Sequence, residues 1–193
     1  FELPAGAALR PGENELVVRV IDSATNEGPF PFAELPHGKQ SWYGPISGIW
    51  QSVRLEVRAA VHLTRLKITP NVAESCAEVT VMLNAPAPSN ALLRLILTDP
   101  HGAQYIMSNQ LSHGVQSHQQ TLAIADPLLW DTETPHLYTL EAQISVDGVL
   151  RDSLSDAFGM RTIATSPEGR LVLNGRPIYL RGALDQDYYP ELI

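Results

Sequence analysis

The sequence predicts an all-β protein whose main part is a two-sheet sandwich. Two observations carry this prediction. Apolar and polar residues alternate in many short runs, the pattern of strands that bury one face. Turn signals rich in Pro, Gly, Asn and Asp separate these runs, and no long stretch has the periodicity of an amphipathic helix. Hydrophobic residues make up 44% of the chain, enough for a folded core.

Two strands are predicted near the N-terminus. They are "NELVVRVID" (14–22) and "SVRLEVR" (52–58), the second of which alternates strictly. A loop rich in Pro and Gly separates them, and loops of this length are usually functional or disordered. Trp42, Tyr43 and Trp50, in and beside this loop, are either core residues or stacking surfaces for a sugar ring.

About seven strands fit between Val61 and Ile163, which is the number and length typical of an immunoglobulin-like sandwich. The clearest are "AEVTVML" (77–83), "LLRLILT" (92–98) and "YTLEAQISV" (138–146). The slipped alternation at Thr64 and Arg65 predicts a bulge or strand break. The Asp-Gly pair at 147–148 predicts a tight hairpin turn.

A second hairpin is predicted after the sandwich. Asn174 and Gly175 both tolerate a positive φ, so the sequence predicts a type I′ turn between strands at 171–173 and 178–180.

Charge and motifs exclude several classes of function. The formal net charge of −8, with scattered Lys and Arg, gives no basic surface for nucleic acid. No apolar run is long enough to cross a membrane as a helix. The single cysteine, Cys76, permits no internal disulfide, and the six histidines form no HExxH motif or other metal-binding pattern. The sequence contains no cofactor motif.

Three segments together resemble glycoside hydrolase family 2. "WYGPISGIWQSVRLEV" (42–57) is similar to the end of the sugar-binding jelly roll in that family. "PLLWDTETPHLYTLE" (127–141) and "FGMRTI" (158–163) are similar to the end of its immunoglobulin-like domain. "GRLVLNGRPIYLRGALDQDYYP" (169–190) resembles the hairpin and first strand that lead into its catalytic (β/α)8 barrel.

The resemblance implies three domains and a function. Residues 1–58 would end the jelly roll, 59–163 would form the sandwich and 164–193 would begin a truncated barrel. The complete enzyme would hydrolyse β-glycosides with retention of the anomeric configuration and would need no cofactor. A homo-oligomer is possible. The two catalytic glutamates of the family lie on later barrel strands, so the resemblance implies an inactive scaffold. The alternative is a carbohydrate-binding module with its own affinity for sugar.

Four residues are candidates for contact with substrate in the complete enzyme. Asp185, Gln186 and Asp187 follow the first barrel-like strand, where active-site loops begin. Many relatives carry Arg, His and Glu-like residues there, so this sequence departs from the family pattern. Asp22 ends an N-terminal strand and matches an Asp that reaches the sugar in some β-galactosidases; its other interpretation is a loop-capping residue. No residue is predicted to be catalytic or to bind a metal.

Overall fold

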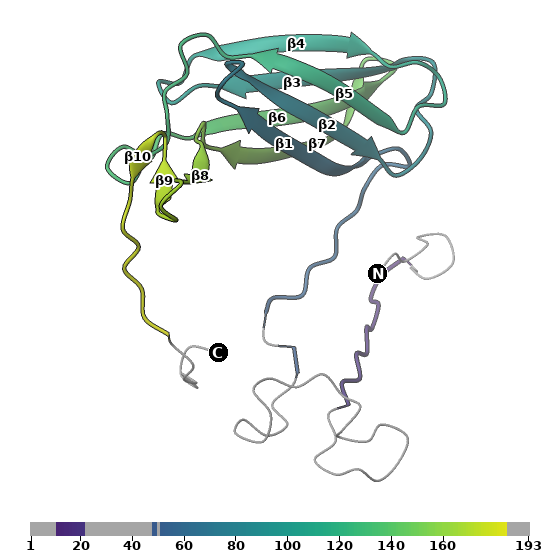
Figure 1. Cartoon of the computed structure of the whole chain (residues 1–193). Helices are drawn as coiled ribbons and strands as arrows, with labels where there is room; N and C mark the ends of the chain where they lie inside the picture. Colours follow the sequence, from purple (N-terminus) through teal and green to yellow (C-terminus); the bar gives the residue numbers. More distant parts are fainter. Residues whose placement is uncertain (1–10, 22–47, 50, 185–193) are drawn as a thin grey trace. The chain divides into compact units, whose positions relative to one another are not determined.

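The computed structural model describes residues 11–21, 48–49 and 51–184. Within it, residues 56–184 belong to one compact unit that contains every described strand. Figure 1 shows this unit as a sandwich followed by a smaller group of strands. The described residues contain no helix, which confirms the predicted all-β class. No segment among them is therefore a helix that could cross a membrane.

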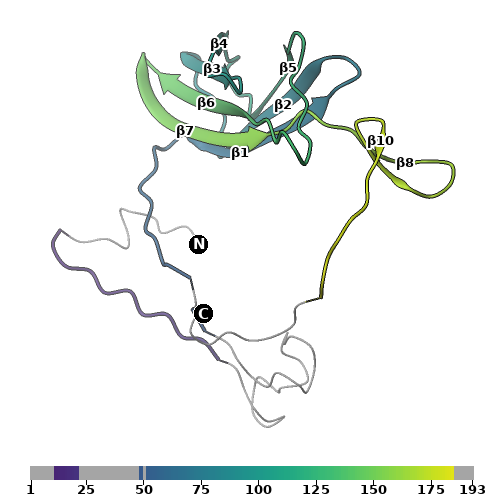
Figure 2. The same ribbon diagram turned by 90° about the vertical axis from the view of Figure 1, so that its left-hand side faces the viewer.

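Seven strands form the sandwich, as the sequence predicted. The strands are β1 (Leu63–Asn71), β2 (Cys76–Leu83), β3 (Ala91–Thr98), β4 (Gln104–Gln110), β5 (Ser117–Ala123), β6 (Tyr138–Val146) and β7 (Val149–Phe158). One sheet has the order β1-β2-β5 and the other β4-β3-β6-β7, and every neighbouring pair is antiparallel. The chain therefore changes sheet between β2 and β3, between β4 and β5, and again before β6 (Figures 1 and 2).

The core lies between the two sheets and consists of the residues that alternation placed on one face of each strand. Leu93, Leu95 and Leu97 of β3 are buried, whereas the intervening Leu92 and Arg94 are exposed. Tyr138 and Phe158 close one end of the core with their rings stacked 5.5 Å apart, and the Tyr138 hydroxyl accepts a hydrogen bond from the Leu128 N–H at 2.9 Å. Burial of this apolar surface is the main stabilising contribution to the sandwich.

The predicted irregularities of the strands are confirmed. The register of β1 against β2 shifts between Leu63 and Arg65, the position of the slipped alternation. Asp147 and Gly148, between β6 and β7, have φ values of 55° and 74°. Positive φ at both central positions is the geometry of a type I′ turn, whose twist matches that of the two strands.

Three short strands follow the sandwich and form a separate sheet. They are β8 (Ile163–Thr165), β9 (Leu171–Leu173) and β10 (Arg176–Pro177), in the order β10-β9-β8. The turn is as predicted, because Asn174 and Gly175 have φ values of 49° and 77°. The predicted partner strand at 178–180 is wrong. A two-residue turn pairs Leu173 with Arg176 and Val172 with Pro177, so the partner strand begins directly after the turn and its last bond is from the Ile178 N–H to the Leu171 carbonyl.

The two predicted N-terminal strands are also not observed. Residues 14–21 and 52–58 are described but belong to no strand, and their apolar residues are exposed, with Val57 91% accessible. An amphipathic segment becomes a strand only where a neighbour supplies hydrogen bonds and covers its apolar face. No described strand pairs with these segments. Asp22 lies outside the described residues.

Candidate functional site

Side-chain hydrogen bonds bind the sandwich to the chain segments on either side of it, in two clusters. The N-terminal cluster joins the segment before β1 to β2 and β7. The C-terminal cluster joins the loop before β6 to the segment after β7 and to the β9–β10 turn. Each cluster depends on one polar side chain with several partners, Asp152 in the first and Asn174 in the second.

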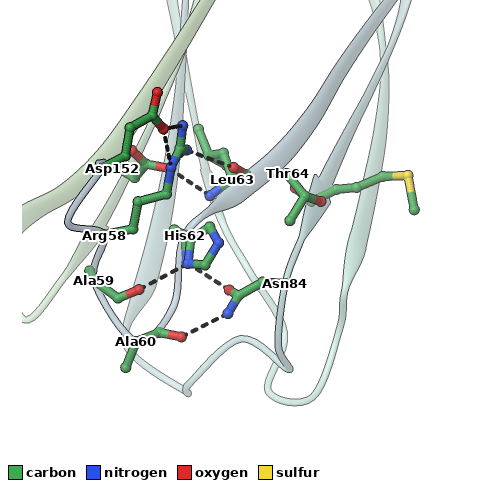
Figure 3. Close-up of polar contacts among 10 residues, drawn as sticks. Arg58, Ala59, Ala60, His62, Leu63, Thr64, Asn84 and Asp152 are labelled. Atoms are coloured by element: carbon green, nitrogen blue, oxygen red, sulfur yellow. Dashed lines mark hydrogen bonds and ion pairs between the residues drawn. The ribbon is translucent and has the colours of Figure 1, made fainter. Parts of the chain in front are cut away.

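Asp152 of β7 holds the start of β1. One of its carboxylate oxygens accepts the Leu63 N–H at 2.8 Å and an Arg58 guanidinium N–H at 3.3 Å (Figure 3). Arg58 also donates to Glu56 at 2.6 Å and to the Leu63 carbonyl at 3.4 Å. The hydrogen bond to Glu56, followed by the negative charge of Asp152, raises the pKa of Arg58. Arg58 therefore links the incoming segment to both β1 and β7.

Asn84, directly after β2, holds the same incoming segment from the strand next to β1. Its side-chain oxygen accepts the His62 N–H at 2.8 Å, and its amide nitrogen donates to the Ala60 carbonyl at 3.0 Å (Figure 3). Both groups of the amide are thus paired with backbone, and the Asn84 N–H donates to the His62 carbonyl at 3.1 Å. Together with the Asp152 contacts, these bonds fix the backbone from residue 58 to residue 63.

Asn174 performs the corresponding task at the C-terminal end. Its side-chain oxygen accepts the Thr162 N–H at 2.9 Å, and its backbone N–H donates to the Thr162 carbonyl at 3.0 Å. Its amide nitrogen donates to the Trp130 carbonyl at 3.0 Å. The same residue thus forms the turn through its positive φ and docks that turn through its side chain.

Trp130 is itself fixed by the end of β7. Its N–H donates to the Met160 carbonyl at 2.8 Å, and the Arg161 guanidinium lies 4.5 Å from the centre of its ring, a cation–π geometry. Gly159 packs so closely that a Cβ atom there would lie 2.7 Å from the Trp130 Cβ. The C-terminal cluster is therefore a continuous set of contacts from Gly159 to Asn174.

A shallow groove of about 370 Å³ lies beside this cluster, lined by Pro70, Leu137, Ala157, Phe158, Gly159 and Arg161. Among the described residues that line it, Arg161 alone is charged. Sugar and other small-molecule sites place several polar groups around the ligand. None of the described residues that line the groove carries a carboxylate.

The described residues do not include any of the predicted substrate residues. Asp22, Asp185, Gln186 and Asp187 lie outside the described residues, as do Trp42, Tyr43 and Trp50. Among the residues that are described, no group of three or more His, Cys, Asp or Glu side chains could hold a metal ion.

Sequence reasoning missed the side-chain contacts of both clusters. Asp152 carried a usable signal, because it shares a face of β7 with Leu154 and Phe158, where alternation predicts an apolar residue. Asn174 was identified only for its backbone conformation. The partners of both lie far away in the sequence, 89 positions for Leu63 and 44 for Trp130.

Replacing Asp152 with alanine is expected to destabilise the sandwich by about 1–2 kcal/mol, because the buried Leu63 N–H loses its acceptor. The lost ion pair with the half-exposed Arg58 should add little. Urea unfolding of the two proteins measures the difference. Asp156→Ala on the same strand removes the same charge from an exposed position and is the control. Equal losses in the two variants would contradict the role given to Asp152.

Asp131 predicts a local response to acid in the loop before β6. Its carboxylate accepts the Thr134 N–H at 2.6 Å and the Glu133 N–H at 2.8 Å, and these bonds lower its pKa. Because the pKa of Asp131 is lower in the folded state, the ionised carboxylate stabilises the loop at any pH above its unfolded-state pKa of about 3.9. This stabilisation is lost as the pH falls through the lowered, folded-state pKa. The Thr134 amide resonance should therefore shift with a midpoint below that value. Asp131→Asn should abolish the shift, and a midpoint above about 4 would contradict the assignment.

The fold and the two clusters define a class of protein module, a β-sandwich whose ends are fixed to flanking chain segments. Comparison with known proteins identifies the family. The profile described as "Glycosyl hydrolases family 2" matches residues 61–161, which includes all seven sandwich strands. The chain belongs to glycoside hydrolase family 2.

Individual relatives agree with this assignment. The chain is 33% identical over 185 residues to a protein of Formosa agariphila provisionally named as a β-glucuronidase, and 26% identical over 199 residues to the β-galactosidase of Photobacterium profundum. These alignments cover 94% and 95% of this chain but only 22% and 18% of the relatives. The chain thus spans about a fifth of their length.

A solved structure shows the same fold. The structure of Bacteroides uniformis β-glucuronidase 2 aligns with 63% of this chain and 17% of its own, with a TM-score of 0.52 and 25% sequence identity.

Proposed function

We propose that this chain is a non-catalytic scaffold within a retaining β-glycosidase of family 2. In the proposed protein, residues 1–58 end a sugar-binding jelly roll, 59–163 form the sandwich and 164–193 begin the catalytic barrel. The observation that carries the proposal is the pair of side-chain clusters. Asp152 and Asn84 hold the chain where it reaches the sandwich, and Asn174 holds it where it leaves.

Rigid attachment at both ends is what a scaffold needs. A flexible linker would let flanking domains reorient freely, whereas paired backbone groups on either side of the sandwich restrict their orientation. The segment after β10 supports the same proposal. Tyr179, Leu180 and Leu184 are 86%, 73% and 82% exposed, and no described strand pairs with them. Their apolar surface suits a partner domain.

Hydrolysis with retention would take place elsewhere in the complete protein. It requires two carboxyl groups about 5 to 5.5 Å apart, on either side of the scissile bond. The clusters described here use their carboxylates for structural hydrogen bonds, as Asp152 does with the Leu63 N–H. Asp22, Asp185, Gln186 and Asp187 are proposed to contact sugar hydroxyls only in that complete protein, whose substrate is a β-glycoside.

Two measurements test the proposal. The chain should hydrolyse neither nitrophenyl β-glucuronide nor nitrophenyl β-galactoside, and calorimetric titration with galactosides, glucuronides and mannosides should show no binding heat. Hydrolysis by the purified chain would overturn the scaffold assignment. Saturable binding of one sugar would instead establish the alternative, a carbohydrate-binding module.

A third measurement tests the parent enzyme. The reading frame that continues beyond this chain should encode barrel-like strands carrying two suitably placed glutamates. Without these glutamates, the proposal of a glycosidase fails even if the sandwich acts as a scaffold.

A further inference from the structure

The strands at the edges of the two sheets differ in how they are protected from pairing with another chain. β1 and β7 lie together on one side of the sandwich, joined by the bond from the Leu63 N–H to Asp152 (Figure 2). β1 carries Arg65, Lys67, Pro70 and a register shift, and β7 carries Arg151 and two aspartates. Charges, prolines and bulges are the features by which natural proteins block edge strands.

β4 and β5, at the other edges, lack all of these features. Their sequences are QYIMSNQ and SHQQTLA, without Lys, Arg, Asp, Glu, Pro or Gly. Inside the sandwich the two strands are tied together, since the Asn109 side chain donates to the Gln120 side chain at 2.7 Å. On the outside, within the described part of the chain, β4 pairs only with β3. β4 is also the more apolar edge, with Tyr105 and Ile106 55% and 48% exposed.

The register shows which backbone groups of β4 are free to pair. The Leu111 N–H donates to Ala91 and the Asp99 N–H donates to Ala103, so the odd-numbered residues of β4 bond to β3. Hydrogen-bonded pairs alternate along an antiparallel ladder. The even-numbered residues therefore direct their N–H and C=O groups away from the sheet. These residues are Gln104, Ile106, Ser108 and Gln110.

We propose that β4 is an interface at which a second copy of this chain adds to the sheet, antiparallel to the first and related to it by a two-fold axis at Met107. This register places Ile106 opposite Ser108 of the second copy and Gln104 opposite its Gln110. All four outward-facing residues then find partners, whereas an axis at Ile106 or Ser108 would pair fewer. Because β4 carries no charge, the pairing brings no like charges together.

The side-chain surface fits the same register. Ile106 lies beside Ile96 of β3 on the outer face of the sheet, and a second copy would extend this apolar strip across the two-fold axis. β5 has the same open backbone, but its outward residues Ser117, Gln119, Thr121 and Ala123 offer little apolar surface. The inference goes beyond the scaffold role and does not depend on catalysis.

Sedimentation velocity of the 193-residue chain at increasing concentration tests the proposal. The chain should show a monomer–dimer equilibrium, and Ile106→Lys should weaken dimerisation at least about tenfold, because lysine blocks an edge strand. Adding Ser108→Glu to that variant should restore much of the loss, since the register places the new Lys opposite the new Glu of the other copy. Ser155→Lys, on the outer face of β7, is the matched control and should leave the dimer unchanged.

Leu180→Asp separates this interface from the exposed segment that the proposed function assigns to a partner domain. If Leu180→Asp abolishes association and Ile106→Lys does not, the contact runs through that segment and the β4 interface is wrong. A chain that stays monomeric at all concentrations would also overturn it.

Amide exchange supplies a second readout. The Ile106 and Ser108 amides should gain protection as the concentration rises, while the Met107 amide stays protected throughout because it bonds to β3. Protection of Ile106 and Ser108 that does not depend on concentration would mean that the chain covers its own edge, and would overturn the proposal.

Discussion

Leu95→Ala is expected to destabilise the sandwich by about 2–5 kcal/mol, the range for large-to-small substitutions in a packed core. Leu95 is fully buried at the middle of β3, between Met107 of β4 and Ala142 of β6. Its small neighbour Ala142 cannot fill the space that the leucine side chain leaves. The substitution thus loses both the transfer free energy of the removed atoms and the contacts around the cavity.

Urea unfolding measures this effect, with Leu92→Ala as the control. Leu92 lies on the same strand, is 37% exposed and points to the opposite face. Its replacement should cost clearly less than that of Leu95, because part of its surface already contacts water. Similar losses at the two positions would contradict the assignment of the core to one face of β3.

Gly159→Ala is expected to destabilise the chain by about 1–3 kcal/mol and to loosen the C-terminal cluster. The new Cβ would lie 2.7 Å from the Cβ and 2.9 Å from the Cγ of Trp130. These atoms lie next to the backbone and cannot move aside as a flexible side-chain end could. The Trp130 backbone must therefore shift, although it bonds to Met160 and accepts the Asn174 side chain.

Hydrogen exchange detects the loosening of the C-terminal cluster. The Thr162 amide, which donates to Asn174, should exchange faster in Gly159→Ala relative to the sandwich amides. Gly182→Ala is the control, because no atom of the described residues lies within 4 Å of a Cβ at that position. Unchanged protection of Thr162 would show that the Trp130 contact does not transmit the shift to the β9–β10 turn.

Most of the sandwich could be predicted because the burial of a strand is a local property. In "LLRLILT" the apolar residues at every second position identify the inner face without knowledge of the neighbours. The bulge at Leu63–Arg65 and the turns at Asp147 and Asn174 were predictable for the same reason, since each depends on the residues at the site itself.

The incorrect predictions concern features that depend on distant residues. Residues 14–21 and 52–58 have the pattern of strands, but no described strand pairs with them. The strand predicted at 178–180 failed because a two-residue turn pairs residue 173 with 176. In each case the local pattern was that of a strand, but the position of the pairing strand decided whether a strand formed.

The sequence alone thus determined the all-β class, the inner face of the main strands and the family, because these follow from short patterns and motifs. Only the tertiary structure decided the strand order, the clusters around Asp152 and Asn174, and the open edge of β4. Each of these depends on which distant segments meet, as Leu63 and Asp152 do across 89 positions. Such long-range contacts follow from the packing of the whole chain, so the local alternation of apolar and polar residues does not specify them.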